Sequence, residues 1–147
     1  MPIGRLIAAS LIALLLTAAT QPAKSGWFGV WKLRLDRPDM KPETLIYTDA
    51  GGGAMRMESV EDKSVLVTRF DGKPATDGGT GARPGGALAI TATSPTSYDW
   101  TYFVAGKPWV RGRNRLAADL RSFSETSWRV AKPEDRITII YERQPAN

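Results

Sequence analysis

The stretch Gly29-Val30-Trp31-Lys32-Leu33-Arg34-Leu35 organises the interpretation of the whole chain. Large apolar residues alternate along it with charged ones. Side chains of a β-strand point alternately to opposite faces of a sheet, so Trp31, Leu33 and Leu35 would share one face. The pattern predicts a strand with one buried face, and such a strand requires a sheet that encloses it.

The sequence after this stretch contains further short segments rich in β-forming residues, separated by turn sequences. The predicted strands are residues 44–49, 54–60, 64–70, 87–93, 98–104, 109–116, 123–130 and 136–142. No long stretch has a helical period. The spacing is typical of an all-β barrel or sandwich. We therefore predict one all-β domain over residues 27–144, an antiparallel up-and-down β-barrel of about eight to ten strands.

We predict the conformation of three segments that connect the strands. Residues 36–43 contain two prolines and predict the first loop. Residues 71–74, which read DGKP, predict a turn. Residues 77–86 contain five glycines and one proline, and we expect a mobile loop there because almost no side chain could bury apolar surface.

The first 19 residues have the pattern of a secretory signal peptide. Arg5 supplies the positive charge, residues 6–16 form an apolar run, and residues 17–19 are small. The run is shorter than the roughly 20 residues that span a bilayer, so we expect cleavage between Ala18 and Ala23 and no membrane anchor afterwards. Residues 20–26 would form a flexible lead-in. The mature protein is predicted to be periplasmic or secreted.

The composition removes several kinds of chemistry. The chain has no cysteine and no histidine, which excludes disulfides, thiolate nucleophiles, Cys/His zinc sites and Ser-His relays. Carboxylates, lysine, serine and tyrosine remain, but they form no recognisable catalytic motif. The formal net charge of +5 is modest and does not indicate a nucleic-acid partner. We expect no enzyme activity, no cofactor and no metal site.

Short motifs resemble those of known proteins. Gly29-x-Trp31 resembles the start of the lipocalins and related calycin barrels, and the order GVWKLRL, FDGKPATDGG, IIYERQ resembles a group of small secreted bacterial lipocalin-like proteins of uncharacterised function. Those proteins typically read GTWKLN, YDGK and VYEKQ at the corresponding places. The resemblance implies a calycin-type barrel in which Gly29 and Trp31 pack at the closed end against a basic residue, here Arg143.

The resemblance also implies that the first and last strands are neighbours. Trp31 would then meet the guanidinium of Arg143, and Leu33 and Leu35 would point inward. On the last strand, the residues expected inside are Ile137, Ile139 and Tyr141. We expect Arg143→Lys to destabilise the fold much less than Trp31→Ala, because the charge and the aliphatic stem persist.

Two sets of side chains are candidates for a binding site. An aromatic row and two flexible thioethers could line a ligand cavity, or could simply fill a narrow barrel. These residues are Tyr98, Trp100, Tyr102, Met55 and Met57.

A second set consists of Arg111, Arg113 and Arg115, which share one strand face. They would face solvent, pair with acids such as Asp99 or Glu125, or bind an anion such as a lipid head group or wall polymer of the cell envelope.

The leading interpretation is an exported, non-enzymatic binding protein that carries or senses a small, partly apolar ligand inside its barrel. The alternative is a structural or interaction protein of the cell envelope with a filled barrel and an exposed basic strand. An interior cavity would distinguish the two. An enzyme has the least support and would require a close, buried pair of carboxylates.

Overall fold

The computed structural model describes residues 24–146, so the predicted signal peptide and the first part of the lead-in lie outside the described residues. One short helix precedes ten strands. The elements are α1 (Lys24–Trp27), β1 (Gly29–Leu33), β2 (Thr44–Gly51), β3 (Ala54–Ser59), β4 (Ser64–Thr68), β5 (Asp71–Thr76), β6 (Gly86–Ser94), β7 (Ser97–Val104), β8 (Lys107–Leu116), β9 (Ser122–Arg129) and β10 (Lys132–Arg143).

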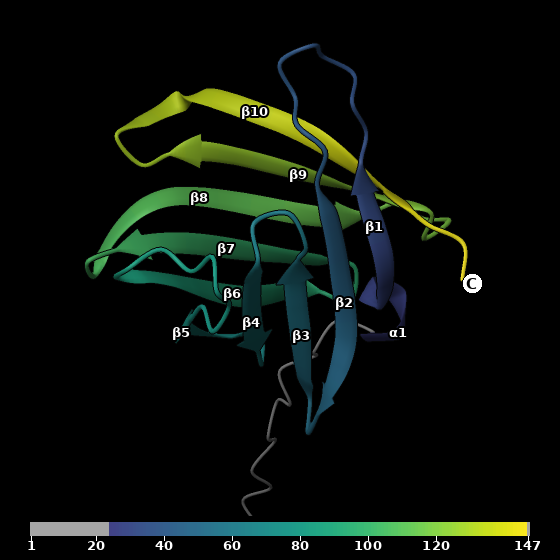
Figure 1. The fold of residues 1–147 in the computed structure, drawn as a ribbon, viewed down its shortest axis with the longest axis horizontal. Helices are drawn as coiled ribbons and strands as arrows, with labels where there is room; N and C mark the ends of the chain where they lie inside the picture. Colours follow the sequence, from purple (N-terminus) through teal and green to yellow (C-terminus); the bar gives the residue numbers. More distant parts are fainter. Residues whose placement is uncertain (1–23, 147) are drawn as a thin grey trace, which may run out of the picture.

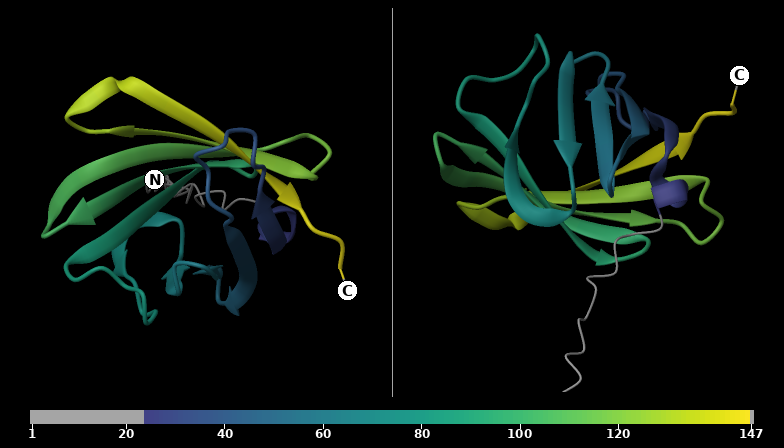
Figure 2. Two further views of the ribbon diagram at one scale, coloured as in Figure 1. Left: turned by 45° about the horizontal axis from the view of Figure 1, so that its top comes forward. Right: turned by 90° about the horizontal axis from the view of Figure 1, so that it is seen from below.

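The ten strands form a single antiparallel sheet in the order β4-β3-β2-β1-β10-β9-β8-β7-β6-β5. The sheet curls so that β2, β3 and β4 run across the direction of β6–β9 (Figure 1). In Figure 2 the first strands and the last ones form two layers that face each other. The prediction of an all-β, up-and-down antiparallel barrel is confirmed, with β1 and β10 as neighbours.

The alternation along β1 is the local reason for this arrangement. Trp31 is completely buried, Leu33 is partly buried and Lys32 is exposed, as the pattern predicts. Leu35 is a correction to the expected inward set, because it follows the end of β1 and is 52% exposed. Ile137 is another correction at 53% exposed, since that part of β10 pairs with β9 alone and lies beyond the stretch of β10 that pairs with β1.

One end of the barrel is filled by aromatic side chains. Trp27 of α1 is fully buried, and its ring centroid lies 4.7 Å from that of Tyr98. The centroids of Trp31 and Phe123 are 5.0 Å apart, and the Trp31 Nε1 donates a hydrogen bond to the Trp27 carbonyl oxygen at 2.9 Å. The helix therefore closes this end. Residues 24–26, which the sequence suggested as part of a flexible lead-in, are helical instead.

Arg143 joins several segments at the closed end. Its guanidinium lies 4.1 Å from the centroid of the Trp31 ring. Its Nε donates to the carbonyl of Leu120 at 2.7 Å, and its two terminal nitrogens donate to the carbonyls of Phe28 and Gly26. A Cβ added to Gly29 would lie 2.6 Å from one of these nitrogens, which is the physical reason for glycine in the Gly-x-Trp motif. We call this arrangement the Arg143 clasp.

The barrel is closed between β4 and β5 by a loop rather than by strand pairing. Residues 77–85 cross this seam, where Gly78 N donates to Val65 O at 2.8 Å and Gly81 N donates to Lys63 O at 2.9 Å. Val65 N in turn donates to Asp77 Oδ1 at 2.7 Å. Backbone hydrogen bonds therefore hold the two end strands of the sheet together.

Two expectations about this region were wrong. Residues 71–74, expected as a turn, begin strand β5, which tolerates Pro74 because it is an edge strand paired only with β6. Residues 77–85, expected to pack poorly, are in close contact with the β3–β4 turn. An added Cβ would lie 2.0 Å from Lys63 O at Gly79 and 1.8 Å from Asp62 O at Gly81, so the missing side chains are what allow the approach.

The clasp predicts that Arg143→Lys is more destabilising than the sequence suggested. A lysine ammonium has no planar fork and cannot reach three carbonyls while it stacks on Trp31. We expect a loss of about 1 to 3 kcal/mol in the free energy of unfolding, and about 3 to 5 kcal/mol for Trp31→Ala, measured by urea denaturation. Arg115→Lys, on an exposed arginine, is the control and should change it by less than about 0.5 kcal/mol. Equal effects of the two lysine variants would contradict the role of the clasp.

The seam predicts opposite results for two glycines of the same loop. Gly81→Ala forces the backbone away from Asp62 and breaks the bond to Lys63, so it should reduce the free energy of unfolding by about 1 to 3 kcal/mol. Gly78→Ala is the matched control, since its Cβ would meet nothing closer than Val65 O at 3.8 Å. Thermal denaturation measures both. If both variants melted like the unmodified protein, the loop would not contribute to closure.

Candidate functional site

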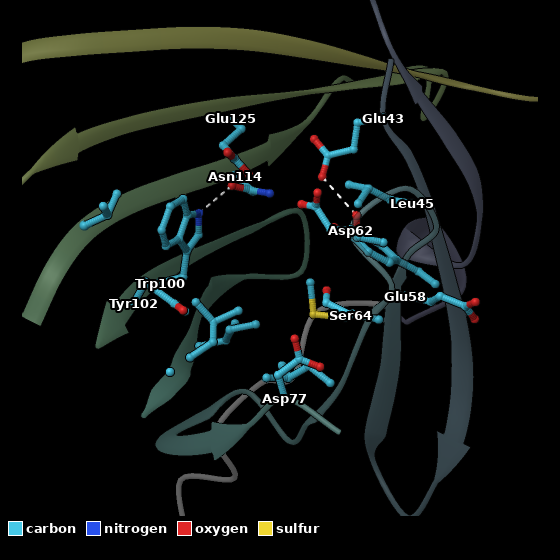
Figure 3. A pocket seen from close by; sticks show the side chains of 18 of the residues that line it. Glu43, Leu45, Glu58, Asp62, Ser64, Asp77, Trp100, Tyr102, Asn114 and Glu125 are labelled. Carbon is cyan, nitrogen blue, oxygen red and sulfur yellow. Dashed lines mark hydrogen bonds between the residues drawn. The ribbon is translucent and has the colours of Figure 1, made fainter. Parts of the chain in front are cut away.

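The barrel contains a cavity of about 420 Å³ between β2–β4 and β6–β10, shown in Figure 3. Its wall is mainly apolar and aromatic. The apolar and aromatic lining residues are Leu45, Tyr47, Met57, Leu66, Ala87, Leu88, Ile90, Tyr98, Trp100, Tyr102, Val110, Ile139 and Tyr141. A cavity of this size and lining is typical of a site for a small molecule, and the barrel is not filled by its own side chains.

The structure brings together most of the aromatic row and thioethers that the sequence suggested. Tyr98, Trp100, Tyr102 and Met57 all line the cavity. Met55 does not, and it is fully buried in the core. The cross-strand partners explain the difference. Met57 pairs with Tyr47 and Leu66, which line the cavity, whereas Met55 pairs with Asp49 and Thr68, which do not.

A hydrogen-bonded network fixes the orientation of the aromatic wall. Trp100 Nε1 donates to Asn114 Oδ1 at 2.8 Å, and Asn114 Nδ2 donates to the Tyr98 hydroxyl at 2.9 Å. Asn114 is only 2% exposed. A Cβ at Gly112 would lie 2.2 Å from the Trp100 ring, so the indole rests against the backbone of β8. Asn114 is not among the site residues predicted from the sequence, although its position between two outward arginines places it on the inner face.

Glu43 lies at the rim of the cavity, where the first loop joins β2. Tyr141 donates its hydroxyl hydrogen to Glu43 Oε2 at 2.6 Å, and Ser59 Oγ bonds to Oε1 at 3.3 Å. Burial raises the pKa of Glu43, the charges of Asp62 and Glu61 add to this effect, and the two hydrogen bonds oppose it. Both oxygens of Glu43 are therefore engaged by the protein.

Glu125 faces the cavity from β9, on the same face as the buried Phe123. In Figure 3 it lies beside Asn114, at the same end of the cavity as Glu43 and Asp62. The pKa of Glu125 is raised from 4.5 to about 7, mainly by burial and also by the charge of Glu43, and a hydrogen bond from Asn114 opposes the shift. The sequence suggested Glu125 as a partner for the arginines, and this was wrong.

The arginines lie on the opposite face of the sheet. Arg111, Arg113 and Arg115 are exposed on the outside of β8. Arg113 forms a two-pronged ion pair with Asp99, with Nε–Oδ1 and Nη2–Oδ2 distances of 2.6 and 2.8 Å. The ladder pairs Arg113 with Asp99 and Thr126, and pairs Asn114 with Glu125, which is why the acid and the arginines are separated by the sheet.

The charged groups that line the cavity are all acidic in the described part of the chain. They are Glu43, Glu58, Asp62, Asp77 and Glu125. Glu58 forms an ion pair with Arg56 at 2.6 Å and points away from the other acids in Figure 3. Asp77 accepts hydrogen bonds from two backbone amides of the seam. Glu43, Asp62 and Glu125 are left to set the electrostatic character of the cavity.

Three buried tyrosines complete the polar groups. Burial raises the pKa of Tyr47, Tyr98 and Tyr141, so these phenols stay protonated and act as neutral hydrogen-bonding groups. Between residues 24 and 146, no acidic cluster is arranged to hold a metal ion. No helix in that range has the length and apolar character needed to cross a membrane.

Comparison with known proteins places the fold. No family model matches the chain, and no curated protein matches it. Among solved structures, fatty-acid-binding protein 1 of Echinococcus granulosus superposes with a TM-score of 0.59 at 17% identity, covering 82% of this chain and 99% of that one. A point mutant of the fluorescent protein UnaG gives 0.56 at 11% identity, covering 83% and 99%. At these identities the likeness concerns architecture, and the chain has the calycin-type barrel fold of these proteins.

Proposed function

We propose that this chain is an exported, non-enzymatic binding protein that carries or senses a small, partly apolar molecule inside its barrel. The observation that carries the proposal is the cavity of about 420 Å³, with an apolar and aromatic wall and with Glu43, Asp62 and Glu125 at one end. Small-molecule sites commonly have this composition, since the wall supplies affinity and a few polar groups fix the orientation.

The similar structures support the same class of function. The name of the Echinococcus granulosus protein states that it binds fatty acids, and that protein shares this barrel. The arrangement of the acids favours binding over catalysis. Glu43 is held by hydrogen bonds from Tyr141 and Ser59, so Glu43 and Glu125 do not form a free acid–base pair.

The proposal of export rests on the first 19 residues, with their charged start, apolar run and small residues near a cleavage site. The alternative is a structural or interaction protein of the cell envelope with a filled barrel and an exposed basic strand. The cavity is inconsistent with a filled barrel. The exposed basic strand of that alternative is present in β8, where Arg111 and Arg115 are exposed and could contact an anionic envelope component.

The energetic position of Glu125 also supports a role in binding. A carboxylate in a cavity loses hydration, and the raised pKa means that its charged form destabilises the folded state. The fold does not need this charge, since no ion pair depends on it among the described residues. A group that weakens the fold and faces a cavity is typical of a functional site.

The proposal predicts that a neutral, environment-sensitive dye binds in the barrel. Nile red should bind the wild-type protein with one-site saturation and an increase in fluorescence, because the cavity wall is apolar. Leu88→Trp places a larger ring in the cavity and should weaken binding by about tenfold or more.

Leu35→Trp is the matched control, because it makes the same change at an exposed position outside the barrel. It should bind the dye like the wild type. Equal dye affinity of the two variants would place the dye outside the cavity, and absence of dye binding by the wild type would contradict the proposed function.

The raised pKa predicts how stability depends on pH. Folded Glu125 holds its proton to higher pH than the unfolded residue, so the folded state binds more protons between pH 4.5 and about 7, and its stability falls as the pH rises through that window. Glu125→Gln removes this effect. We expect the free energy of unfolding of the variant to equal that of the wild type at about pH 4.5 and to exceed it by roughly 1 to 3 kcal/mol at about pH 8, measured by urea denaturation.

Glu134→Gln makes the same change at an exposed position of β10 and serves as the control. Its free energy of unfolding should follow that of the wild type at both pH values, because Glu125 is intact. A Glu125→Gln variant that is less stable than the wild type at the higher pH would mean that the carboxylate is well compensated in the folded protein.

A further inference from the structure

We infer that the ligand carries a positively charged nitrogen, a protonated amine or a quaternary ammonium group, which binds against the Glu125 carboxylate at the acidic end of the cavity. The inference rests on the proposed function and narrows it to a ligand class. It sets this barrel apart from one that would hold a fatty acid, because the charge of the cavity has the wrong sign for a carboxylate ligand.

Glu125 has hydrogen-bonding capacity that the protein does not use. An ionised carboxylate has about four acceptor sites. Asn114 is its polar neighbour, but one amide hydrogen of Asn114 is donated to Tyr98 and its oxygen accepts from Trp100. Asn114 can therefore offer Glu125 no more than one hydrogen. Most of the acceptor capacity of Glu125 is open to a donor inside the cavity.

The described part of the cavity wall offers no cation that would compensate the charge of Glu125. Within residues 24–146, the lining includes no lysine and no arginine. Arg143 donates to three carbonyls at the closed end, and Arg113 is paired with Asp99 on the outer face. An anionic ligand would meet Glu43, Asp62 and Glu125 with no positive charge to balance them, so the site selects against it.

The cavity wall near Glu125 is aromatic and apolar. Trp100 donates a hydrogen bond to Asn114, which is the polar neighbour of Glu125. Tyr102 follows Trp100 on the inner face of β7. Aromatic faces attract cations, and this attraction adds to that of the carboxylate. Leu88 and Ile90 offer apolar surface beside this group. The cavity therefore fits a small amphiphile with a cationic nitrogen and one short chain or ring.

Binding should also be coupled to the protonation of Glu125. The titratable groups that influence Glu125, or are influenced by it, are Glu43 from the first loop, Tyr47 from β2, Tyr98 from β7 and Tyr141 from β10. The tyrosines stay neutral in this range. A cation favours the ionised carboxylate, so its affinity should rise as the pH increases from about 6 to about 8, while an alkylamine with a pKa near about 10 stays protonated.

Three matched probes test the inference by titration calorimetry on the mature wild-type protein at about pH 8. They are octylamine, octanoate and octanol, which share one chain and differ in the charge of the head group. We expect octylamine to bind about tenfold or more tightly than either of the others. If octanoate or octanol bound as tightly as octylamine, or if octylamine did not bind, the inference would be overturned.

Glu125→Gln tests the residue that the inference names. It should weaken octylamine binding by roughly 10- to 100-fold, leave octanol almost unchanged, and abolish the rise of octylamine affinity between about pH 6 and about pH 8. Glu134→Gln is the matched control and should retain wild-type affinity and its pH dependence. If Glu125→Gln bound octylamine like the wild type, the cationic site would lie elsewhere and the inference would be wrong. If Glu125→Gln did not fold, the comparison of the three probes on the wild type would still decide.

The failures of the two proposals are distinguishable. Binding of Nile red in the cavity without preferred binding of octylamine would leave the binding function standing and overturn the ligand class. Failure of Nile red and of all three probes to bind would overturn both. Preferred binding of octylamine that Glu125→Gln reduces would support the inference, and Nile red bound in the cavity would support the binding function on which it rests.

Discussion

The Arg143 clasp is the interaction on which the rest of the structure depends. The first strand pairs with the last through the ladder between β1 and β10, and one guanidinium reinforces this pairing by stacking on Trp31 and donating to the carbonyls of Phe28 and Gly26. The residues it joins are as much as 117 positions apart in the chain. A planar group with several fixed donors is suited to this task, because it satisfies backbone carbonyls at the end of the helix and stacks on a ring at the same time.

The closed end also makes the acidic end possible. The aromatic cluster around Trp27, Trp31 and Phe123 is fully buried and closely packed, so it provides burial energy that does not depend on the cavity. Glu125 and the rim acid Glu43 work in the opposite direction, since each loses hydration on folding. The barrel thus divides its interior into a stabilising half and a half whose polar groups are available to a ligand.

Period-two alternation was enough to predict most of the fold from the sequence. It identified nine of the ten strands in outline and placed Tyr98, Trp100 and Tyr102 on one inner face. It could not locate β5, because Gly72 and Pro74 are typical of turns and only the edge position makes them acceptable in a strand. It also could not say that residues 77–85 are packed, since a glycine-rich composition is compatible with mobility and with close backbone approach alike.

The charge of the cavity was beyond the reach of the sequence because it depends on register. A shift of one residue in a strand exchanges its two faces, so Glu125 could have met the arginines of β8 or faced the interior. Phe123 decides between these outcomes. Its ring is buried against Trp31 at the closed end, and Glu125, two residues later on the same strand, must then point into the barrel. The packing that closes one end therefore also determines that the adjoining part of the cavity is acidic, with the positive charges of β8 left on the outside.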